Sequence, residues 1–147
     1  MLSEVEVLGT FPNIEIVGIN RPDYLGGRSR YHKEYDQGLV SVHLSNGQDI
    51  CFNEITDCCA SVSLRTDISE FKELIGKKLA SLIFVKSEYI YHNEYGEYST
   101  YYYYKFVFSD NTEFEFDFDG FHGNGGYYAA HVDVTISDID GNVKKDE

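Results

Sequence analysis

Proline, cysteine and basic residues are all scarce in this chain of 147 residues. Only 2 prolines occur beside 13 tyrosines and 10 phenylalanines, and this combination favours strands over long loops. The aromatic content also argues against a disordered chain, despite the high charge. A chain of this length can bury a core without disulfides or bound metal, so we expect one domain over residues 1–147.

The three cysteines, Cys51, Cys58 and Cys59, do not form a metal-binding pattern. Zinc requires about four ligands at workable spacing. The chain has no Cys-x-x-Cys pair, and the nearest histidine, His43, belongs to a different expected strand. We therefore interpret Cys58 and Cys59 as structural and expect no metal or other cofactor. The odd cysteine count, with no signal peptide and no long apolar run, predicts a cytoplasmic protein without membrane spans.

Basic residues are outnumbered by acidic ones, 12 to 25, which gives a net charge of −13. The chain before Lys86 has 12 acidic and 8 basic residues, a net charge of −4, whereas the chain from Lys86 onward has 13 and 4, a net charge of −9. Such a field repels nucleic acid and anionic membranes and attracts basic surfaces. Solubility is the more common reason for a charge of this kind and remains an alternative.

Alternating apolar residues separated by turn residues predict that most of the chain forms strands. The expected strands cover residues 5–7, 14–18, 39–44, 49–52, 58–64, 79–91, 98–108, 112–119 and 127–136. A turn at Gly9–Asn13 would separate the first two strands. Asn46-Gly47, the residue pair most favoured in two-residue hairpins, would join the third to the fourth.

One helix is expected between Asp67 and Ile75. Asp67 and Glu70 have the spacing of a capping box at its first turn. Phe71, Leu74 and Ile75 recur at helical spacing, so they should pack the helix onto a sheet. The fold class that follows is α+β and mainly β, with a single antiparallel meander sheet and one short helix packed on it.

The strand expected at residues 112–119 alternates aromatic and acidic side chains. Because successive side chains of a strand point to opposite faces, one face carries Phe114, Phe116 and Phe118. The opposite face carries a row of four carboxylates, those of Glu113, Glu115, Asp117 and Asp119. The preceding strand contains four consecutive tyrosines at positions 101–104, of which two should face each side. Exposed tyrosines are typical of interfaces and can stack on bases, whereas cross-strand pairing would only stabilise the sheet.

No catalytic motif is complete in this sequence. The glycine-rich loop at residues 120–126 precedes a strand and lacks the lysine of a P-loop, so it is interpreted as a hairpin connection. His122 and His131 are possible bases, but no serine or cysteine nucleophile is fixed beside either of them. Residues 138–142 resemble the start of a calcium loop without its twelfth-position glutamate. We therefore do not expect an enzyme.

Four segments resemble the pattern of a small domain family of unknown function that occurs largely in phages and bacteria. They are an Asp-Cys-Cys strand at residues 57–62, a Leu-Ile-Gly helix end at 74–77, a Tyr-Lys-Phe segment at 104–106, and a Gly-Tyr-Tyr segment at 125–128 followed by Val132. The resemblance covers residues 38–137 as a family-like core. It leaves 1–37 as N-terminal strands and a loop, and 138–147 as an acidic tail. It implies a phage or mobile-element origin and carries no catalytic residues with it.

Two functional hypotheses follow. The first is a non-catalytic binding protein that antagonises a basic host protein, such as a nucleic-acid-binding defence enzyme, by imitating phosphate charge. Its expected partner-binding residues are Glu94, Glu97, Tyr101, Tyr103, Glu113, Glu115, Asp117 and Asp119. The alternative is a protein that binds or sequesters a small molecule, such as a nucleotide signal. Its expected ligand-binding residues are Arg21, Arg28, Arg30, His122 and Asn124. Convergence of arginines and tyrosines on one pocket would favour the alternative, and neither hypothesis includes direct binding to nucleic acid or membrane.

Overall fold

The structure, a computed structural model, describes residues 5–21, 38–57, 60–92, 97–123, 128–139 and 143–145. Strands dominate these ranges and the only helix among them is short, which agrees with the expected mainly β class. The elements are β1 (Glu6–Asn20), β2 (Gly38–Leu44), β3 (Asp49–Thr56), β4 (Ser61–Leu64), α1 (Ile68–Lys72), β5 (Lys78–Tyr91), β6 (Tyr98–Phe108), β7 (Glu113–Phe121), β8 (Ala130–Ser137) and β9 (Val143–Lys145).

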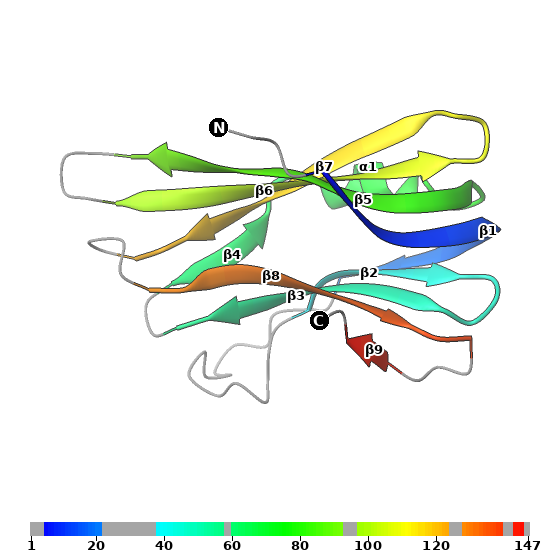
Figure 1. Cartoon of the computed structure of the whole chain (residues 1–147), viewed down its shortest axis with the longest axis horizontal. Coiled ribbons are helices and arrows are strands. Elements are labelled where there is room, and N and C mark those ends of the chain that lie inside the picture. Colours follow the sequence, from blue (N-terminus) through cyan, green and yellow to red (C-terminus); the bar gives the residue numbers. More distant parts are fainter. Residues whose placement is uncertain are drawn as a thin grey trace.

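The strands form one antiparallel sheet in the order β4-β7-β6-β5-β1-β2-β3-β8-β9. The expected meander holds for the runs β1-β2-β3, β5-β6-β7 and β8-β9 but not between them, because β5 pairs with β1, β8 with β3, and β4 with β7. The sheet is folded into two layers, one containing β5, β6 and β7 and the other containing β2, β3 and β8 (Figure 1). The alternation of apolar and polar residues identifies a segment as a strand, but it does not specify which other strand pairs with it.

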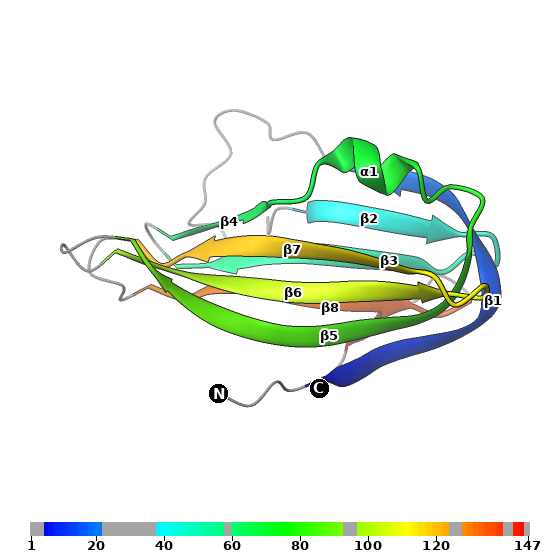
Figure 2. The same cartoon turned by 90° about the horizontal axis from the view of Figure 1, so that it is seen from above.

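β1 connects the two layers. It pairs with β5 as far as Glu15 and with β2 from Ile16 onward, and Figure 2 shows it curving from one layer to the other. The turn expected at Gly9–Asn13 is wrong, because β1 runs through this segment as one strand. The register with β5 shifts here, and Asn13 adopts a φ of 56°. Such an irregularity bends a strand without reversing it, which is what the crossing between layers requires.

The core lies between the two layers and is largely aromatic. Phe52 of β3 contacts the rings of Tyr104, Phe116 and Phe118 from the opposite layer, at centroid distances of 5.4, 5.3 and 5.5 Å. Phe116 and Phe118 are both buried, so the alternation expected for β7 is confirmed. Burial of Tyr104 raises the pKa of its phenol, as expected for a group whose charged form is kept from water.

The helix α1 packs on the sheet as expected, because the Phe71 ring contacts Phe114 and Phe116 of β7. Figure 2 shows α1 above β2 and next to the end of β1. Asp67 is its N-cap, and the carboxylate accepts a hydrogen bond of 2.9 Å from the backbone N–H of Ser69. Phe71 and Leu74 are buried as expected, but Ile75 is 49% exposed, because the helix ends at Lys72 before Ile75 can turn inward. Within the described ranges, no helix is long and apolar enough to cross a membrane.

Two expectations about connections hold in part. A hairpin turn containing Asn46-Gly47 forms as expected, and Gly47 has a φ of 92°. Its loop has three residues instead of the expected two, because the N–H of Leu44 donates to the carbonyl of Gln48 at 2.9 Å. The acidic tail expected from residue 138 onward is wrong in part, because β9 pairs with β8 within that segment. β9 supplies backbone hydrogen-bond partners on the side of β8 that does not pair with β3.

Candidate functional site

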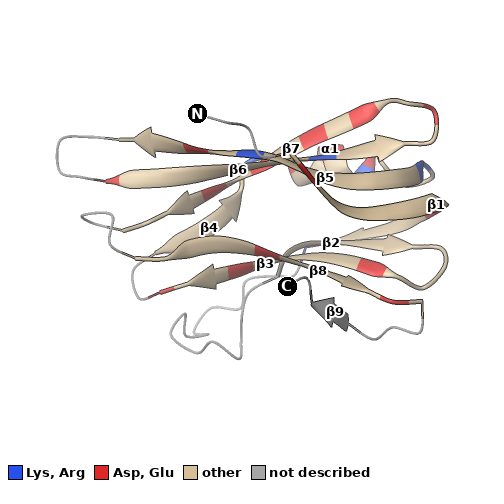
Figure 3. Cartoon of the chain, viewed as in Figure 1, with Lys and Arg blue, Asp and Glu red and all other residues tan. Residues whose placement is uncertain are grey.

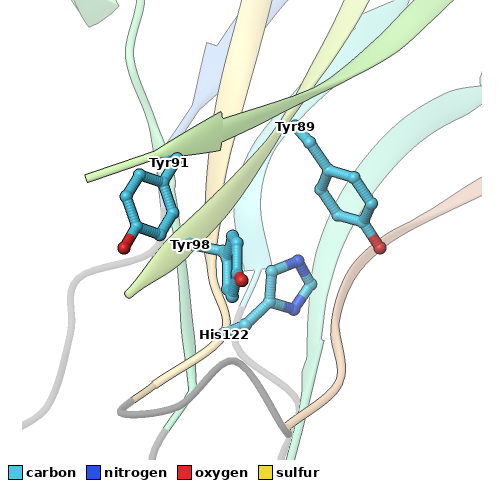
Figure 4. Close-up of a pocket in the computed structure, with 4 residues that line it drawn as sticks. All are labelled: Tyr89, Tyr91, Tyr98 and His122. Carbon is cyan, nitrogen blue, oxygen red and sulfur yellow. The ribbon is translucent and has the colours of Figure 1, made fainter. Parts of the chain in front are cut away.

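A pocket of about 340 Å³ lies where β5 and β7 end and β6 begins. It is lined by Tyr89, Tyr91, Tyr98 and His122. In Figure 4 the rings of Tyr98 and His122 lie side by side, with Tyr91 and Tyr89 on either side of them. The volume falls at the lower end of the range for small-molecule sites, roughly 300–1,000 Å³, and the lining is predominantly aromatic, as is usual for such sites.

A bulge in β5 turns two of these tyrosines toward the pocket. Phe84 packs against the core, and strict alternation from it would place Lys86 inside. The register with β6 instead shifts between Phe84 and Lys86, so the strand faces are exchanged beyond that point. Tyr89 and Tyr91 consequently share a face with Tyr98, which pairs directly with Tyr91. A one-residue shift exchanges every following side chain between faces, so this bulge is needed to form the pocket.

His122 is held in place by hydrogen bonds at both ring nitrogens. Nδ1 lies 2.8 Å from the carbonyl oxygen of Tyr128, which can only accept, so Nδ1 carries a proton. Nε2 lies 2.5 Å from the hydroxyl of Thr100, and in the neutral ring it accepts from that hydroxyl. The ring therefore serves as a fixed wall of the pocket, because neither nitrogen is left open toward a ligand.

The two layers approach each other closely next to the pocket. The Tyr102 hydroxyl, on β6, donates a hydrogen bond of 2.7 Å to the carbonyl of Ala130 on β8, and burial raises the pKa of this phenol. Gly120 of β7 makes the approach possible, since a Cβ atom there would lie 2.9 Å from the same carbonyl oxygen. The hydrogen bond and the glycine fix the separation of the layers where the pocket begins.

The outer face of the β5-β6-β7 layer carries the side chains expected to bind a partner. Tyr101 pairs with Asp119 and Tyr103 with Asp117 across β6 and β7, so tyrosines and carboxylates do share one face. Acidic residues occur in both layers, and several lie along β7 (Figure 3). The prediction that the four β7 carboxylates form one row is therefore confirmed.

Basic side chains on the same face offset part of that row. Arg65 pairs with Asp117 at 2.5 Å and lies 4.0 Å above the ring of Tyr101, while Lys105 pairs with Glu113 at 3.3 Å. Tyr103 donates to Glu88 at 3.0 Å. Burial, followed by this hydrogen bond, raises the pKa of the Tyr103 phenol. The face is thus a mixed array of charged and aromatic groups rather than a uniformly negative one.

Of the remaining predicted site residues, Arg21 and Glu97 are described by the structure, and neither is among the lining residues of the pocket. Arg21 is exposed just after β1. Glu97 precedes β6, and its carbonyl accepts a hydrogen bond of 2.8 Å from the N–H of His92. Four further predicted site residues lie outside the described residues: Arg28, Arg30, Glu94 and Asn124. Cys58 and Cys59, which we interpreted as structural, also lie outside them.

Sequence reasoning selected His122 but not the three tyrosines that accompany it. Tyr98 lies at an even position of β6, in phase with the buried Tyr104, and this phase is a signal that could have placed it inside. Tyr89 and Tyr91 gave no such signal, because the bulge that redirects them has no characteristic sequence such as a glycine.

The fold and the pocket define a two-layered antiparallel β protein with an aromatic cavity at one end of its layers. A family model for DUF7448, a domain of unknown function, matches residues 15–134, and the chain belongs to this family. The expectation of an uncharacterised domain family is thus confirmed, and the match includes part of β1, which the resemblance had left out. No curated protein and no solved structure matches the chain.

Proposed function

We propose that the protein is a non-catalytic binding protein and that the pocket lined by Tyr89, Tyr91, Tyr98 and His122 holds a small ligand. The observation that supports this proposal is the convergence of three aromatic side chains and a fixed imidazole on one cavity of about 340 Å³. The pocket lies where strands end, and binding residues are commonly positioned at strand ends by a rigid scaffold. The hydrogen bonds of His122 and Tyr102 provide that rigidity here.

Binding without catalysis is favoured by the chemistry of the lining. A general base needs a ring nitrogen or a carboxylate directed at the reacting proton. His122 uses both nitrogens in internal hydrogen bonds. The described part of the pocket lining includes no serine, cysteine or carboxylate. Tyrosine supplies a large contact area at low entropic cost, which suits recognition.

Nuclear magnetic resonance of the protein with ¹³C-labelled tyrosine rings tests this function. Ligands found in a screen of small aromatic and cationic compounds should shift the ring signals of Tyr89, Tyr91 and Tyr98. Tyr91→Leu should weaken such ligands about tenfold, because an aromatic contact contributes roughly 1–3 kcal/mol. Tyr103→Leu, on the outer face, should leave their affinity unchanged. A screen whose hits shift only tyrosines outside the pocket would refute the proposal.

A second candidate is binding of a basic host protein to the outer face, in a cytoplasmic protein of phage origin. The observation in its favour is that Glu115 and Asp119 form no ion pair with any described lysine or arginine, although Glu113 and Asp117 do. Tyr101 and Arg65, stacked beside them, are residue types that dominate binding energy at interfaces. This candidate is placed second because Arg65 and Lys105 neutralise part of the acidic row that would attract a basic protein.

The acidic outer face can be tested with oligolysine as the basic probe. Reversing Glu113, Glu115 and Asp117 to lysine should slow association about tenfold at low salt, since steering follows the local field. The matched control reverses Glu6, Glu70 and Glu73, which gives the same net charge with the outer face intact. Equal association rates for the two triple variants would show that only the total charge matters.

A further inference from the structure

We propose that the pocket binds a compact alkylated ammonium cation, such as a quaternary ammonium group, in preference to a flat aromatic ring or an anion. This inference rests on the proposed function, because it names the ligand class of the same pocket. Three properties of the described lining residues support it: the spacing of the rings, the absence of basic side chains among these residues, and hydrogen-bonding groups limited to the tips of the phenol rings.

The spacing of the rings does not suit a flat ligand held between two of them. A ring sandwiched by two others requires parallel planes about 7 Å apart, twice the contact distance of carbon atoms. Tyr91 and Tyr98 have centroids 5.4 Å apart and planes inclined at 58°, and Tyr89 and Tyr98 are 6.4 Å apart and inclined at 50°. Tyr89 and His122 are 6.1 Å apart and inclined at 73°. The inclined rings form the walls of a cup, which fits a rounded group better than a plane.

The charge of the pocket favours a cation. No lysine or arginine is among the lining residues that the structure describes, so a phosphate or carboxylate would find no counter-charge among them. Tyrosine rings attract cations placed over their faces through the ring quadrupole. The net charge of −13 adds a long-range attraction in the same direction. A nucleotide, the ligand expected from sequence, would bring its phosphates into this unfavourable environment.

The hydrogen-bonding groups of the pocket favour an alkylated cation over a primary ammonium. A primary ammonium has three N–H donors, and each one that leaves water needs an acceptor. The imidazole of His122 is already occupied at both nitrogens. Among the described lining residues the remaining acceptors are therefore the three phenol hydroxyls, which lie at the tips of the rings and not over their faces. Methyl groups on the nitrogen need no acceptor and pack directly against the ring faces. Recognition of quaternary ammonium groups by several aromatic rings uses this same chemistry.

Choline and its neutral carbon analogue 3,3-dimethylbutan-1-ol are the probes for this proposal. Choline should shift the ¹³C ring signals of Tyr89, Tyr91 and Tyr98, with sodium chloride at the same concentration as the control for ionic strength. The analogue has nearly the same shape without the charge, so it should bind about two- to fivefold more weakly. Tyr103 signals, on the outer face, should not respond to either compound.

Variants of Tyr89, which is 78% exposed and contributes little to folding, separate the ring from its hydroxyl. Tyr89→Phe keeps the ring face and should retain choline binding, whereas Tyr89→Leu should weaken it at least twofold. Equal binding of choline and its neutral analogue would overturn the cation assignment. So would a pocket that responds to phenol or indole but not to choline, and in that case the proposed function would still stand. A pocket that responds to no compound would overturn both.

Discussion

Replacing Phe52 by alanine should lower the free energy of unfolding by about 3–5 kcal/mol. The side chain is fully buried and contacts three aromatic rings of the opposite layer, those of Tyr104, Phe116 and Phe118. Two of these contacts are edge-to-face, a geometry that contributes about 0.5–1.5 kcal/mol beyond the buried area. The cavity left by Phe52→Ala would be bounded by rings on rigid strands, so little of it could be filled by relaxation.

Urea unfolding measures this loss as a lower midpoint, provided that the dependence of the unfolding free energy on urea concentration is the same for both proteins. Tyr91→Ala is the matched control, because it also removes an aromatic ring but at an exposed position. It should change stability by no more than about 0.5 kcal/mol. If Phe52→Ala and Tyr91→Ala shifted the unfolding midpoint equally, the two layers would not be held together through Phe52.

The structure agrees with the sequence at two places where a local pattern determined the outcome. The alternation of Phe and acidic residues in β7 was sufficient to predict both faces, because the strand is regular and one of its faces is buried. The Asn46-Gly47 turn was predictable for a similar reason, since Gly47 needs a positive φ that other residues adopt with strain. Both features depend on neighbouring residues in the chain.

The sequence was insufficient wherever the outcome depended on irregular pairing between distant strands. The shift between Phe84 and Lys86 in β5 places Tyr89 and Tyr91 in the pocket, and neither residue at the shift is a glycine. The bend of β1 near Asn13 likewise looked like a turn, although the strand continues through it. In both places, packing between the layers selects a conformation that the local sequence permits but does not specify.

These irregularities also explain why the candidate site was recognised only in part. His122 was selected for its chemistry, which is visible in sequence, but its neighbours Tyr89 and Tyr91 lie on β5 beyond the bulge that sets which way they face. The sequence correctly placed the four β7 carboxylates on one face, and their role in binding a partner stays a prediction. Their ion-pair partners Arg65 and Lys105 were not predicted, since Arg65 lies after β4 and Lys105 lies on β6. Charge compensation across strands therefore requires the strand order, which the sequence did not provide.

Replacing Phe71 by alanine should also cost about 3–5 kcal/mol, although α1 is only one short helix. Phe71 is fully buried, and its ring contacts Phe114 and Phe116 of β7 at centroid distances of 5.1 and 5.0 Å. A helix of this length is not stable alone, so its position depends on this packing. Loss of the ring would leave a cavity beside Phe116, which also contacts Phe52, and would thereby weaken contacts between the layers.

Ile75→Ala is the matched control for this helix, because Ile75 lies just beyond α1 and is half-exposed. It should change the free energy of unfolding by about 0.5 kcal/mol or less, since it removes little buried surface. Urea unfolding of both variants, followed by circular dichroism, distinguishes them. A loss below about 1 kcal/mol for Phe71→Ala would mean that the site closes after truncation and that α1 is dispensable for the core. A large loss for Phe71→Ala together with a small loss for Ile75→Ala would establish that the Phe71 side chain holds the helix. The spacing of apolar residues in the sequence predicted the burial of Phe71 correctly, but it wrongly placed Ile75 on the same buried face.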